Sequence, residues 1–371
     1  GLQHGTLLRD QLIEGGEWFD GSSIRFIEDA AALMGLDEEA LAQSLPEVVD
    51  ECQGIVDGVD HPAWTMSRCM MLAYGDITFE AVQNEMPGGC SQVVVAPDAT
   101  TGSFIHGRKL EWLDDQFILE YPTLFVRRPE EGLSSVIFGF PGSVSPFTGM
   151  NEAGLVLASN ENYGAQPPDR TGESHIQLMF RLLHQASTVD EVRDALETMQ
   201  HGSAETIVAS DATGAASAFE LCPEGMAERP LSDDGVLYAT NHIIHADTEP
   251  LHREVADDHD SRSRLARLEE LLEPTGAATI HGTIGLEELV SVFRDTTNPL
   301  TGEVHPADLV IGGGTIANNG ALQAAVFLPQ ERVLYIAEGD APVTQNPFTG
   351  FSLDALLEGD IEAVPTPAIV P

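Results

Sequence analysis

The sequence predicts an α+β protein in which one β-sheet packs on another with helices outside them, preceded by a mostly helical N-terminal quarter. Three observations predict it. Residues 1–89 show helical spacing of apolar residues, short apolar runs separated by turns begin at Cys90, and blocks of helical and strand pattern then follow one another. The 371 residues are 42% hydrophobic, which suffices for a large core in one big domain or two closely joined domains.

The N-terminal quarter is expected to consist of helices. Apolar spacing predicts helices over residues 23–34, 37–56 and 61–74. Ser22 or Ser23 is a plausible cap for the first helix, and Pro46 is a kink or a break within the second. Residues 84–89 end in Pro-Gly-Gly, which predicts a flexible approach to Cys90.

From Cys90 onward, strand and helix patterns follow in blocks. A hairpin of residues 90–96 and 103–106 is expected first, and its second strand ends in Gly107–Trp112. Further strands are expected over residues 123–126, 135–140, 155–159, 206–209, 215–221, 236–240, 321–328 and 332–337. Helices are expected over residues 173–185, 188–199, 260–272 and 286–293.

The chain is strongly acidic, with 60 acidic and 17 basic residues and a net charge of −43. Lys109 is its only lysine, and every other basic residue is arginine. Such a surface on an apolar core indicates adaptation to concentrated salt, where the Debye length falls to about 3 Å at 1 M. The strong apolar strands disfavour the alternative of an acidic disordered protein. The acidity also excludes nucleic acid as a partner, because phosphate binding needs basic stripes.

The cysteine pattern gives no metal site. The four cysteines are Cys52, Cys69, Cys90 and Cys222. They contain no CxxC pair and no metal-ligand spacing, so no metal or other cofactor is expected. A disulfide between Cys52 and Cys69 is compatible with the sequence, although nothing in the sequence demands it.

The sequence gives little about location or assembly. No apolar run approaches 18 residues, so no membrane span is expected, and no signal-peptide pattern is visible. Because the chain starts at Gly1, a leader could already have been removed. We therefore expect a cytoplasmic protein of a high-salt cell, or a secreted one if a leader preceded Gly1. The oligomeric state does not follow from the sequence.

Cys90 is the first candidate for chemistry. Its thiol can attack the carbonyl of Gly89, moving the acyl group from nitrogen to sulfur before the thioester is hydrolysed. A glycine leaves that carbonyl unshielded and lets the chain bend sharply. The freed α-amine, with a reference pKa of about 7.7–8.0, can then serve as the base for the thiol of the same residue. The competing interpretation is a structural cysteine at the start of a strand.

The end of the hairpin carries three charged residues in four positions. Arg108 can lie beside the thiol and favour the thiolate, and Glu111 can orient Arg108 or the α-amine. A surface ion pair at a hairpin end is the alternative. Lys109 adds weight to a functional site, because a chain that otherwise lacks lysine carries one next to Arg108. We expect Lys109 to depress the pKa of the cysteine or to hold an anionic group of the substrate.

Asn241 follows the apolar strand 236–240. An asparagine at a strand end can present its amide to an oxyanion, although turn formation and helix capping are equally ordinary uses. His242 and His245 lack a third metal ligand and are interpreted as structural.

Five segments occur in one order that resembles a known family. They are Gly88-Gly89-Cys90, Gly107-Arg108-Lys109-Leu110-Glu111, Gly149-Met150-Asn151-Glu152-Ala153-Gly154-Leu155, Thr240-Asn241-His242 and Ser261-x-x-Arg264-Leu265. The order resembles the cysteine N-terminal-nucleophile hydrolases, above all the isopenicillin-N acyltransferase-like family, which is kin to bile-salt hydrolases, penicillin V acylases and acid ceramidase. Segments near both ends, Gly1-x-x-His4-Gly5, Glu51-x-x-Gly54-Ile55 and residues 337–342, extend the resemblance over nearly the whole chain.

The resemblance implies an αββα sandwich that hydrolyses or transfers a linear amide through an acyl-cysteine. It implies that Cys90 is nucleophile and base, and that a small-molecule amide or acyl donor is the substrate. The other catalytic residues that it implies are Arg108, Glu111, Asn241 in the oxyanion hole, Asn160 as a second polar group with Asn162 one strand step away, and Arg264 as a second arginine.

Two departures from the family pattern accompany this assignment. Relatives usually have Asn at the position of Lys109 and Asp at that of Glu111, so Lys109 is expected to influence which substrate is accepted. Cleavage between Gly89 and Cys90 would divide the chain into a prosegment, residues 1–89, and a catalytic domain, residues 90–371. After cleavage the catalytic domain would have its own prosegment as a partner.

Two other functions stay open at this point. One is a bile-salt, penicillin V or ceramide type of amidase. The other is a non-catalytic, uncleaved relative that keeps the fold as a scaffold or binding protein.

Overall fold

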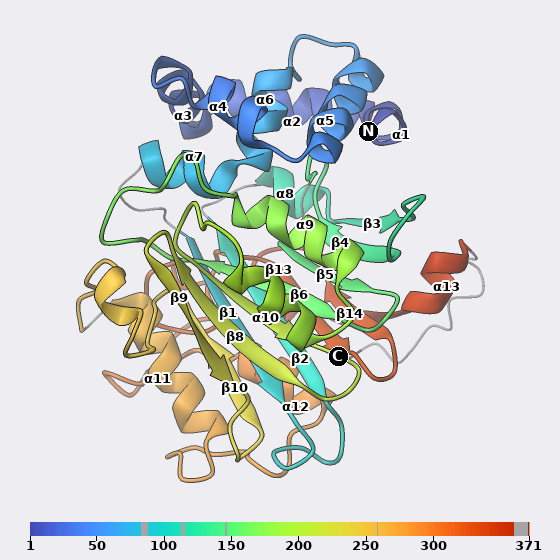
Figure 1. Cartoon of the computed structure of the whole chain (residues 1–371). Helices are drawn as coiled ribbons and strands as arrows, with labels where there is room; N and C mark the ends of the chain where they lie inside the picture. Colours follow the sequence, from blue (N-terminus) through green and yellow to red (C-terminus); the bar gives the residue numbers. More distant parts are fainter. Residues whose placement is uncertain (83–87, 113–115, 145–146, 258, 360–369, 371) are drawn as a thin grey trace.

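The computed structural model describes residues 1–371 except 83–87, 113–115, 145–146, 258, 360–369 and 371. Two antiparallel sheets lie face to face with helices outside them, and a layer of N-terminal helices covers one end (Figure 1). This confirms the predicted α+β class. Residues 83–87, which make up most of the expected flexible approach to Cys90, lie outside the described residues.

The first sheet carries Cys90. Within the described residues it has six strands in the order β10-β1-β2-β13-β14-β15. Their bounds are β1 Gly88–Val95, β2 Ile105–Trp112, β10 Val236–Ala239, β13 Ala321–Leu328, β14 Val333–Ala337 and β15 Phe348–Ser352. The hairpin β1–β2 is thus at the centre of the sheet, and its register pairs Cys90 with Leu110.

The second sheet packs over the first. Its described strands follow chain order from β3 to β9, seven in all. Their bounds are β3 Thr123–Arg127, β4 Ser135–Gly139, β5 Thr148–Asn151, β6 Val156–Glu161, β7 Glu205–Ser210, β8 Ala216–Cys222 and β9 Gly225–Pro230. A small ribbon of β11 (Thr297–Asn298) and β12 (Glu303–Val304) stands apart.

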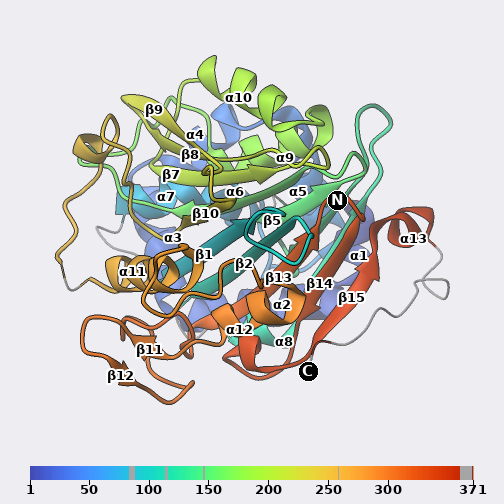
Figure 2. The same ribbon diagram turned by 90° about the horizontal axis from the view of Figure 1, so that it is seen from below.

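Each sheet has an apolar face toward the other sheet and an apolar face toward helices, which is why four layers form (Figure 2). Val94 of the six-stranded sheet packs with Val208 of the seven-stranded sheet. On the outer faces, α11 (Asp260–Leu272) and α12 (Leu286–Phe293) cover the first sheet, and α9 (His175–Gln185) and α10 (Val189–Glu197) cover the second. The other helices described outside the N-terminal layer are α8 Gln116–Glu120, α13 Leu353–Glu358 and two short 3-10 turns, Glu249–Leu251 and Val343–Gln345.

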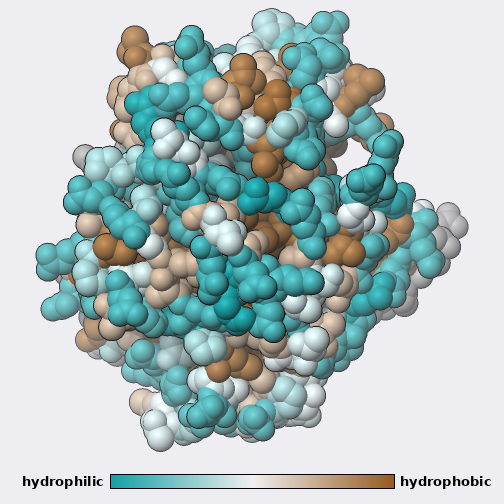
Figure 3. All heavy atoms as spheres, viewed as in Figure 1, coloured by the Kyte–Doolittle hydropathy of each residue, from teal (hydrophilic) through white to brown (hydrophobic). Residues whose placement is uncertain are grey.

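The N-terminal residues 2–82 form a helical layer with its own apolar core. Its helices are α1 Leu2–Leu7, α2 Arg9–Gly21, α3 Ser23–Leu33, α4 Leu36–Gln43, α5 Pro46–Val59, α6 Met66–Ala73 and α7 Gly75–Val82. A disulfide joins Cys52 to Cys69, as the sequence allowed. Apolar side chains also appear at the surface of this layer (Figure 3), and Phe26 and Leu33 are among its exposed apolar residues.

Local signals explain the helix boundaries in this layer. The Ser22 hydroxyl accepts a hydrogen bond from the Ile24 amide and so caps α3, as predicted. Pro46 is the first residue of α5, where its missing N–H costs nothing, so the expected helix 37–56 is broken into two. The sequence did not predict α1, α2 and α7 in this layer, nor α8, α13, β5, β9, β11, β12 and β15 in the rest of the described chain.

Ion pairs and hydrogen bonds fasten the layer to the sheets. Arg127 on β3 makes a bidentate pair with Glu51 on α5, with N–O distances of 2.6 and 2.8 Å. On α7, the buried carboxylate of Asp76 accepts hydrogen bonds from the hydroxyls of Ser174 and Ser203 and from the amide of His175. Among the described helices, none combines the length and apolar character that crossing a membrane requires.

Candidate active site

Cys90 lies near the start of β1, where the helical layer meets the six-stranded sheet. Its side chain is 5% exposed. Nη2 of Arg108, on the neighbouring strand β2, lies 3.5 Å from its sulfur and also donates a hydrogen bond to the Ser159 carbonyl at 2.9 Å. The bond to Ser159 ties the guanidinium to the second sheet, so the charge beside the thiol is held from two sides.

The thiol is not poised as a thiolate in the continuous chain. Burial raises the pKa of Cys90, and the charges of Arg108 and Arg264 offset this only in part. The charge of Arg108 by itself lowers the pKa of the thiol, as expected, but the net shift of that pKa is upward because burial outweighs it. A buried thiol of this kind would need a base before it could act as a nucleophile.

The backbone nitrogen of Cys90 has a specific partner. It donates a hydrogen bond to Oδ1 of Asn241 at 2.5 Å. Nδ2 of Asn241 donates to the Glu161 carbonyl at 2.8 Å, which leaves its second hydrogen for another acceptor. The backbone N–H of Asn241 donates a hydrogen bond to the hydroxyl of Ser261 at the start of α11. The structure thus brings Asn241 to Cys90, as its place at a strand end suggested.

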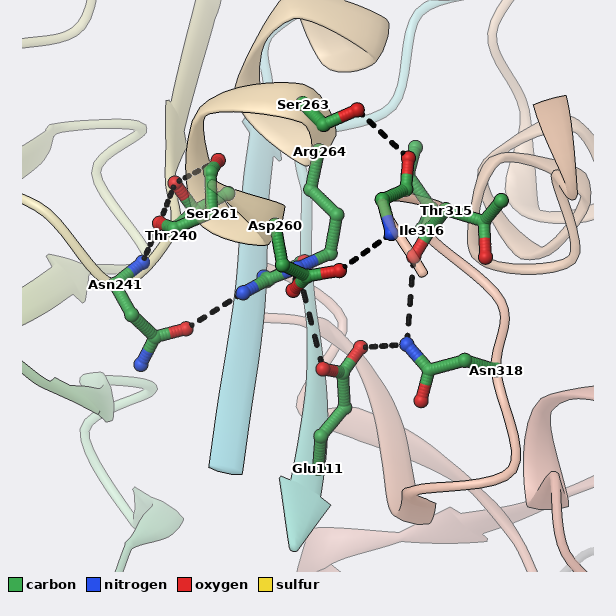
Figure 4. A network of polar contacts seen from close by, with 12 residues as sticks. Glu111, Thr240, Asn241, Asp260, Ser261, Ser263, Arg264, Thr315, Ile316 and Asn318 are labelled. Carbon is green, nitrogen blue, oxygen red and sulfur yellow. Dashed lines mark hydrogen bonds and ion pairs between the residues drawn. The ribbon is translucent and has the colours of Figure 1, made fainter. Parts of the chain in front are cut away.

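Arg264 on α11 points toward Asn241 (Figure 4) and also contacts the backbone of Cys90. Its Nη1 donates to the carbonyl of Cys90 at 2.6 Å, and its Nη2 donates to Oδ1 of Asn241 at 3.0 Å. Asp260, four residues earlier on the same helix, accepts from its Nε at 2.7 Å. Burial acts to raise the pKa of Asp260, but the charge and hydrogen bond of Arg264 hold it below its ordinary value. The sequence analysis missed Asp260, although its helical spacing of four from Arg264 could have indicated it.

Glu111 lies opposite Gly89 in the register of β1 and β2. Its Oε1 accepts a hydrogen bond from Nδ2 of Asn318 at 2.9 Å. Its Oε2 has no hydrogen-bond partner among the described residues and lies 3.9 Å from Nε of Arg264. A side chain at residue 89 would overlap this oxygen, so only glycine fits at the position before Cys90.

Lys109 does not lie where substrate binding would require. Its side chain is fully buried, and its ammonium contacts Oε1 of Glu111 and the carbonyl of Ile316. Successive strand residues point to opposite faces, so Lys109 faces away from Arg108. This placement contradicts the expectation that Lys109 contacts the substrate directly.

Asn160 also differs from expectation. Its Nδ2 donates to the carbonyls of Ala239 and Thr240 at 3.2 and 3.1 Å, and its Oδ1 accepts from Gln92 at 2.8 Å. These bonds join the two sheets behind Asn241. The described residues that line the cavity include the next residue, Glu161, but not Asn160. A catalytic role for Asn160 stays a prediction, and its contacts suit support of Asn241.

A cavity of about 650 Å³ opens beside Cys90 between the helical layer and the sheets. Its polar end holds Cys90 together with Arg108, Glu111, Asn241 and Arg264. Its apolar walls come from both parts of the chain, with Phe19, Ile24, Leu72 and Phe79 from the helical layer and Trp112, Ile118, Phe140 and Ile176 from the remainder. The helical layer therefore shapes the site rather than merely covering it.

Two glutamates of the cavity escaped the sequence analysis. Glu161 ends β6 and lies directly across from Glu205 at the start of β7. Burial raises the pKa of Glu161 to about 8, with Glu80 and Asp76 adding to the shift, and burial raises that of Glu205 as well. No local motif marks these residues, because strand pairing alone brings them together. Within the described residues no group of three or more His, Cys, Asp or Glu side chains could hold a metal ion.

The family comparison identifies an enzyme that acts on carbon–nitrogen bonds. The chain belongs to the acyl-coenzyme A:6-aminopenicillanic acid acyl-transferase family, whose sequence model matches residues 117–341. That match includes Asn160, Asn241 and Arg264, whereas Cys90 and its strand partner β2 precede it. No curated protein matches the chain.

Solved structures with a similar fold include three amidases. A Caenorhabditis elegans ortholog of N-acylethanolamine-hydrolyzing acid amidase has 14% identity and a TM-score of 0.42, covering 65% of this chain and 93% of that chain. A conjugated bile acid hydrolase variant from Clostridium perfringens has 15% identity and a TM-score of 0.44, covering 67% and 89%. Penicillin V acylase from Agrobacterium tumefaciens has 14% identity and a TM-score of 0.43, covering 71% and 91%.

Proposed function

We propose that the protein is an autoprocessed cysteine amidohydrolase or acyltransferase that works through an acyl group on Cys90. One observation carries the proposal. The thiol, the backbone nitrogen and the carbonyl of Cys90 each meet a separate polar partner, Arg108, Asn241 and Arg264 respectively, at the polar end of a cavity. A structural cysteine has no need of such an arrangement.

Processing would use the Cys90 thiol against the preceding peptide bond. The sulfur attacks the Gly89 carbonyl, the thiol proton passes to the leaving nitrogen, and a thioester replaces the amide. Water then hydrolyses the thioester, which releases the carboxylate of Gly89 and regenerates the thiol. The nitrogen freed in this way would already be held by Oδ1 of Asn241.

Turnover would repeat the chemistry on a substrate amide. The α-amine of Cys90 takes the thiol proton, and the sulfur attacks the substrate carbonyl. The second hydrogen of Nδ2 of Asn241 can be donated to the developing oxyanion. A donor fixed in this way is the kind that contributes most to such reactions. The proton passes to the leaving amine, and water or another amine then takes the acyl group from Cys90.

The proposal assigns residues 1–89 to a prosegment that stays bound after cleavage. The Arg127–Glu51 pair and the hydrogen bonds of Asp76 hold it to the sheets. Phe19, Ile24 and other apolar residues of the layer line the cavity, so losing the layer would open the site to water.

The substrate is proposed to be a small molecule with an apolar acyl portion lying along these walls. Substrates named for the similar structures, an N-acylethanolamine, a conjugated bile acid and penicillin V, are candidates of this kind. The cavity does not separate hydrolysis from acyl transfer, and bile-salt, penicillin V or ceramide type amidases remain the alternatives within the class.

Turnover of a panel of N-acyl amino acids, N-acylethanolamines, bile-salt conjugates and penicillin V in molar salt tests the proposal. The wild-type protein should hydrolyse at least one, and a substrate mixed with enzyme and quenched early should add one acyl group to Cys90 by mass spectrometry. Amidase activity that survives in Cys90→Ala would refute the mechanism. Cys222→Ala, which alters the other free cysteine among the described residues, should keep the activity.

A non-catalytic scaffold is the second candidate, favoured by the raised pKa of the buried thiol in the continuous chain. A thiol-reactive probe distinguishes the two. Labelling of Cys90 below about pH 8 indicates an activated nucleophile, whereas an inert Cys90 in a chain that turns over no substrate indicates the scaffold.

A further inference from the structure

We propose that Lys109 is a positioning residue for Glu111, and that these two residues act as one unit on the Gly89–Cys90 junction. The inference rests on the proposed function, because it assigns a task within the chemistry of Cys90. It replaces the expectation that Lys109 binds substrate.

The register of the hairpin places the pair beneath the junction. Lys109 lies opposite Ser91 on β1, and Glu111 lies opposite Gly89, so both face α11. Arg108 lies on the thiol's face of the strand instead and faces the other sheet. The pair is thus on the far side of β1 from the sulfur but directly against the backbone that would be cut.

The two carboxylate oxygens of Glu111 have different contacts, and Lys109 is one reason for the difference. Oε1 of Glu111 is bound by both the Lys109 ammonium and Nδ2 of Asn318. Oε2 has no hydrogen-bond partner among the described residues and adjoins the space above the Cα of Gly89. Anchoring one oxygen leaves the other as an open acceptor beside Gly89, the residue whose carbonyl cleavage would release.

The charge of Lys109 would also affect the ionisation of the α-amine of Cys90. Lys109 and Arg264 face Glu111 and Asp260 in a buried cluster under the junction. Burial and the charge of Arg264 lower the pKa of Lys109, while Asp260 and Cys90 act to raise it. Without Lys109, the charge of Glu111 would act on the α-amine of Cys90 less compensated, and a nearby anion favours the ammonium form.

The geometry also explains why lysine occurs here in a chain that otherwise uses arginine. Glu111 Oε1 and the Ile316 carbonyl approach a single nitrogen from two elements, β2 and the segment before β13. A compact ammonium on a flexible stem satisfies such a site, whereas a planar guanidinium needs more room and a matching fork of acceptors.

A double-mutant cycle of Lys109→Met, Glu111→Gln and the double variant tests the unit. Denaturing mass spectrometry gives the fraction cleaved between residues 89 and 90, and the pH profile of kcat/KM gives the ionisation of the base. In Lys109→Met the acidic limb of the kcat/KM profile should move up by about one pH unit, because the uncompensated charge of Glu111 raises the pKa of the nearby base. The double variant should be no slower than Glu111→Gln, because Lys109 acts through Glu111.

Arg267→Gln is the matched control. It breaks another largely buried pair, Arg267–Asp295, on the same helix as Arg264 without touching Gly89 or Cys90. It should lower the unfolding midpoint yet leave the pH profile in place. Lys109→Gln serves as the second variant if the methionine variant does not fold, since an amide keeps the polar contacts without the charge.

The outcomes separate the two proposals. An unchanged acidic limb in the Lys109 variants, or strictly additive losses in the double variant, would overturn the role of Lys109 while leaving Cys90 as the nucleophile. A wild-type protein that is neither cleaved nor active would instead contradict the proposed function and, with it, this inference.

Discussion

Gly89 is confined by side chains that converge on it from two elements. Oε2 of Glu111 occupies the space that a side chain at residue 89 would need, and Nη2 of Arg264 lies 2.9 Å from the same point. Two charged groups therefore fill the space beside the backbone of Gly89, immediately before Cys90. A larger residue would have to displace them.

We expect Gly89→Ala to slow cleavage at least tenfold and to lower the free energy of unfolding by about 1–3 kcal/mol, the usual cost of overpacking. Denaturing mass spectrometry during a time course measures the first and denaturant unfolding the second. Gly225→Ala is the control, because the nearest described atom to its added methyl, Cδ1 of Leu251, is 3.9 Å away. Equal cleavage rates in the two variants would contradict the account.

At this scale the sequence predicted which residues gather, but not which way they face. Cys90, Arg108, Asn241 and Arg264 meet as expected. At Asn160 the cavity is lined by the next residue, Glu161, and a catalytic role for Asn160 stays a prediction. Alternation along a strand decides this, and its phase depends on pairings between distant segments that no local pattern reveals.

Among the elements, α7 has the most consequential position. It links the helical layer to the seven-stranded sheet and carries two buried carboxyls, Asp76 and Glu80. Glu80 accepts a hydrogen bond from the Gly164 amide at 2.8 Å. Burial nevertheless raises its pKa to about 7, above the value of an exposed glutamate. Docking of α7 thus depends on a carboxyl that ionises near neutral pH.

We expect the free energy of unfolding to fall as the pH rises from about 5 to about 8. A carboxyl whose pKa is raised on folding stabilises the fold fully below its unfolded value, near 4.3, and that contribution is lost as the pH passes the folded value, about 7 for Glu80. Unfolding midpoints across this range measure the effect. Glu80→Gln should reduce the slope, leaving the part that the raised pKa values of Glu161 and Glu205 contribute, and an unchanged slope in that variant would refute the assignment.

Element predictions succeeded where apolar periodicity was strong. Helices α9, α11 and α12 were found within two residues of their ends. α7 was missed because it is only eight residues long and its two carboxyls, Asp76 and Glu80, are buried against distant segments rather than exposed to solvent. β9 was missed for a related reason, since its Gly-Met-Ala-Glu-Arg-Pro sequence has little strand propensity and depends on pairing with β8.

For the whole molecule, a net charge of −43 is the dominant long-range term. Self-repulsion of this size destabilises a compact state in dilute salt, where the Debye length is about 10 Å at 0.1 M, and screening relieves it. We therefore propose that the protein is adapted to concentrated salt.

The unfolding midpoint should rise steadily between about 0.1 M and 2 M potassium chloride. Calorimetry or circular dichroism at fixed pH measures it, and equal osmolality of an uncharged solute serves as the control for effects other than screening. A midpoint that is unchanged or lowered by the salt, and raised only by the uncharged solute, would contradict salt adaptation.

The layered architecture could be predicted from the order of strand and helix blocks, and the family resemblance supplied its type. The cavity could not be predicted from the sequence, because its walls combine Phe19 and Ile24 with Trp112 and Phe140, residues about a hundred positions apart. Such a surface follows from how the helical layer docks, which depends on contacts like Arg127–Glu51 rather than on any motif.

The central claim is that Cys90 becomes an N-terminal nucleophile, and intact mass under denaturing conditions tests it most directly. The wild-type protein should give two species, residues 1–89 and 90–371, whose masses add up to the full chain plus one water, while Cys90→Ala stays whole. A single uncut wild-type mass that persists through long incubation in molar salt would contradict the account.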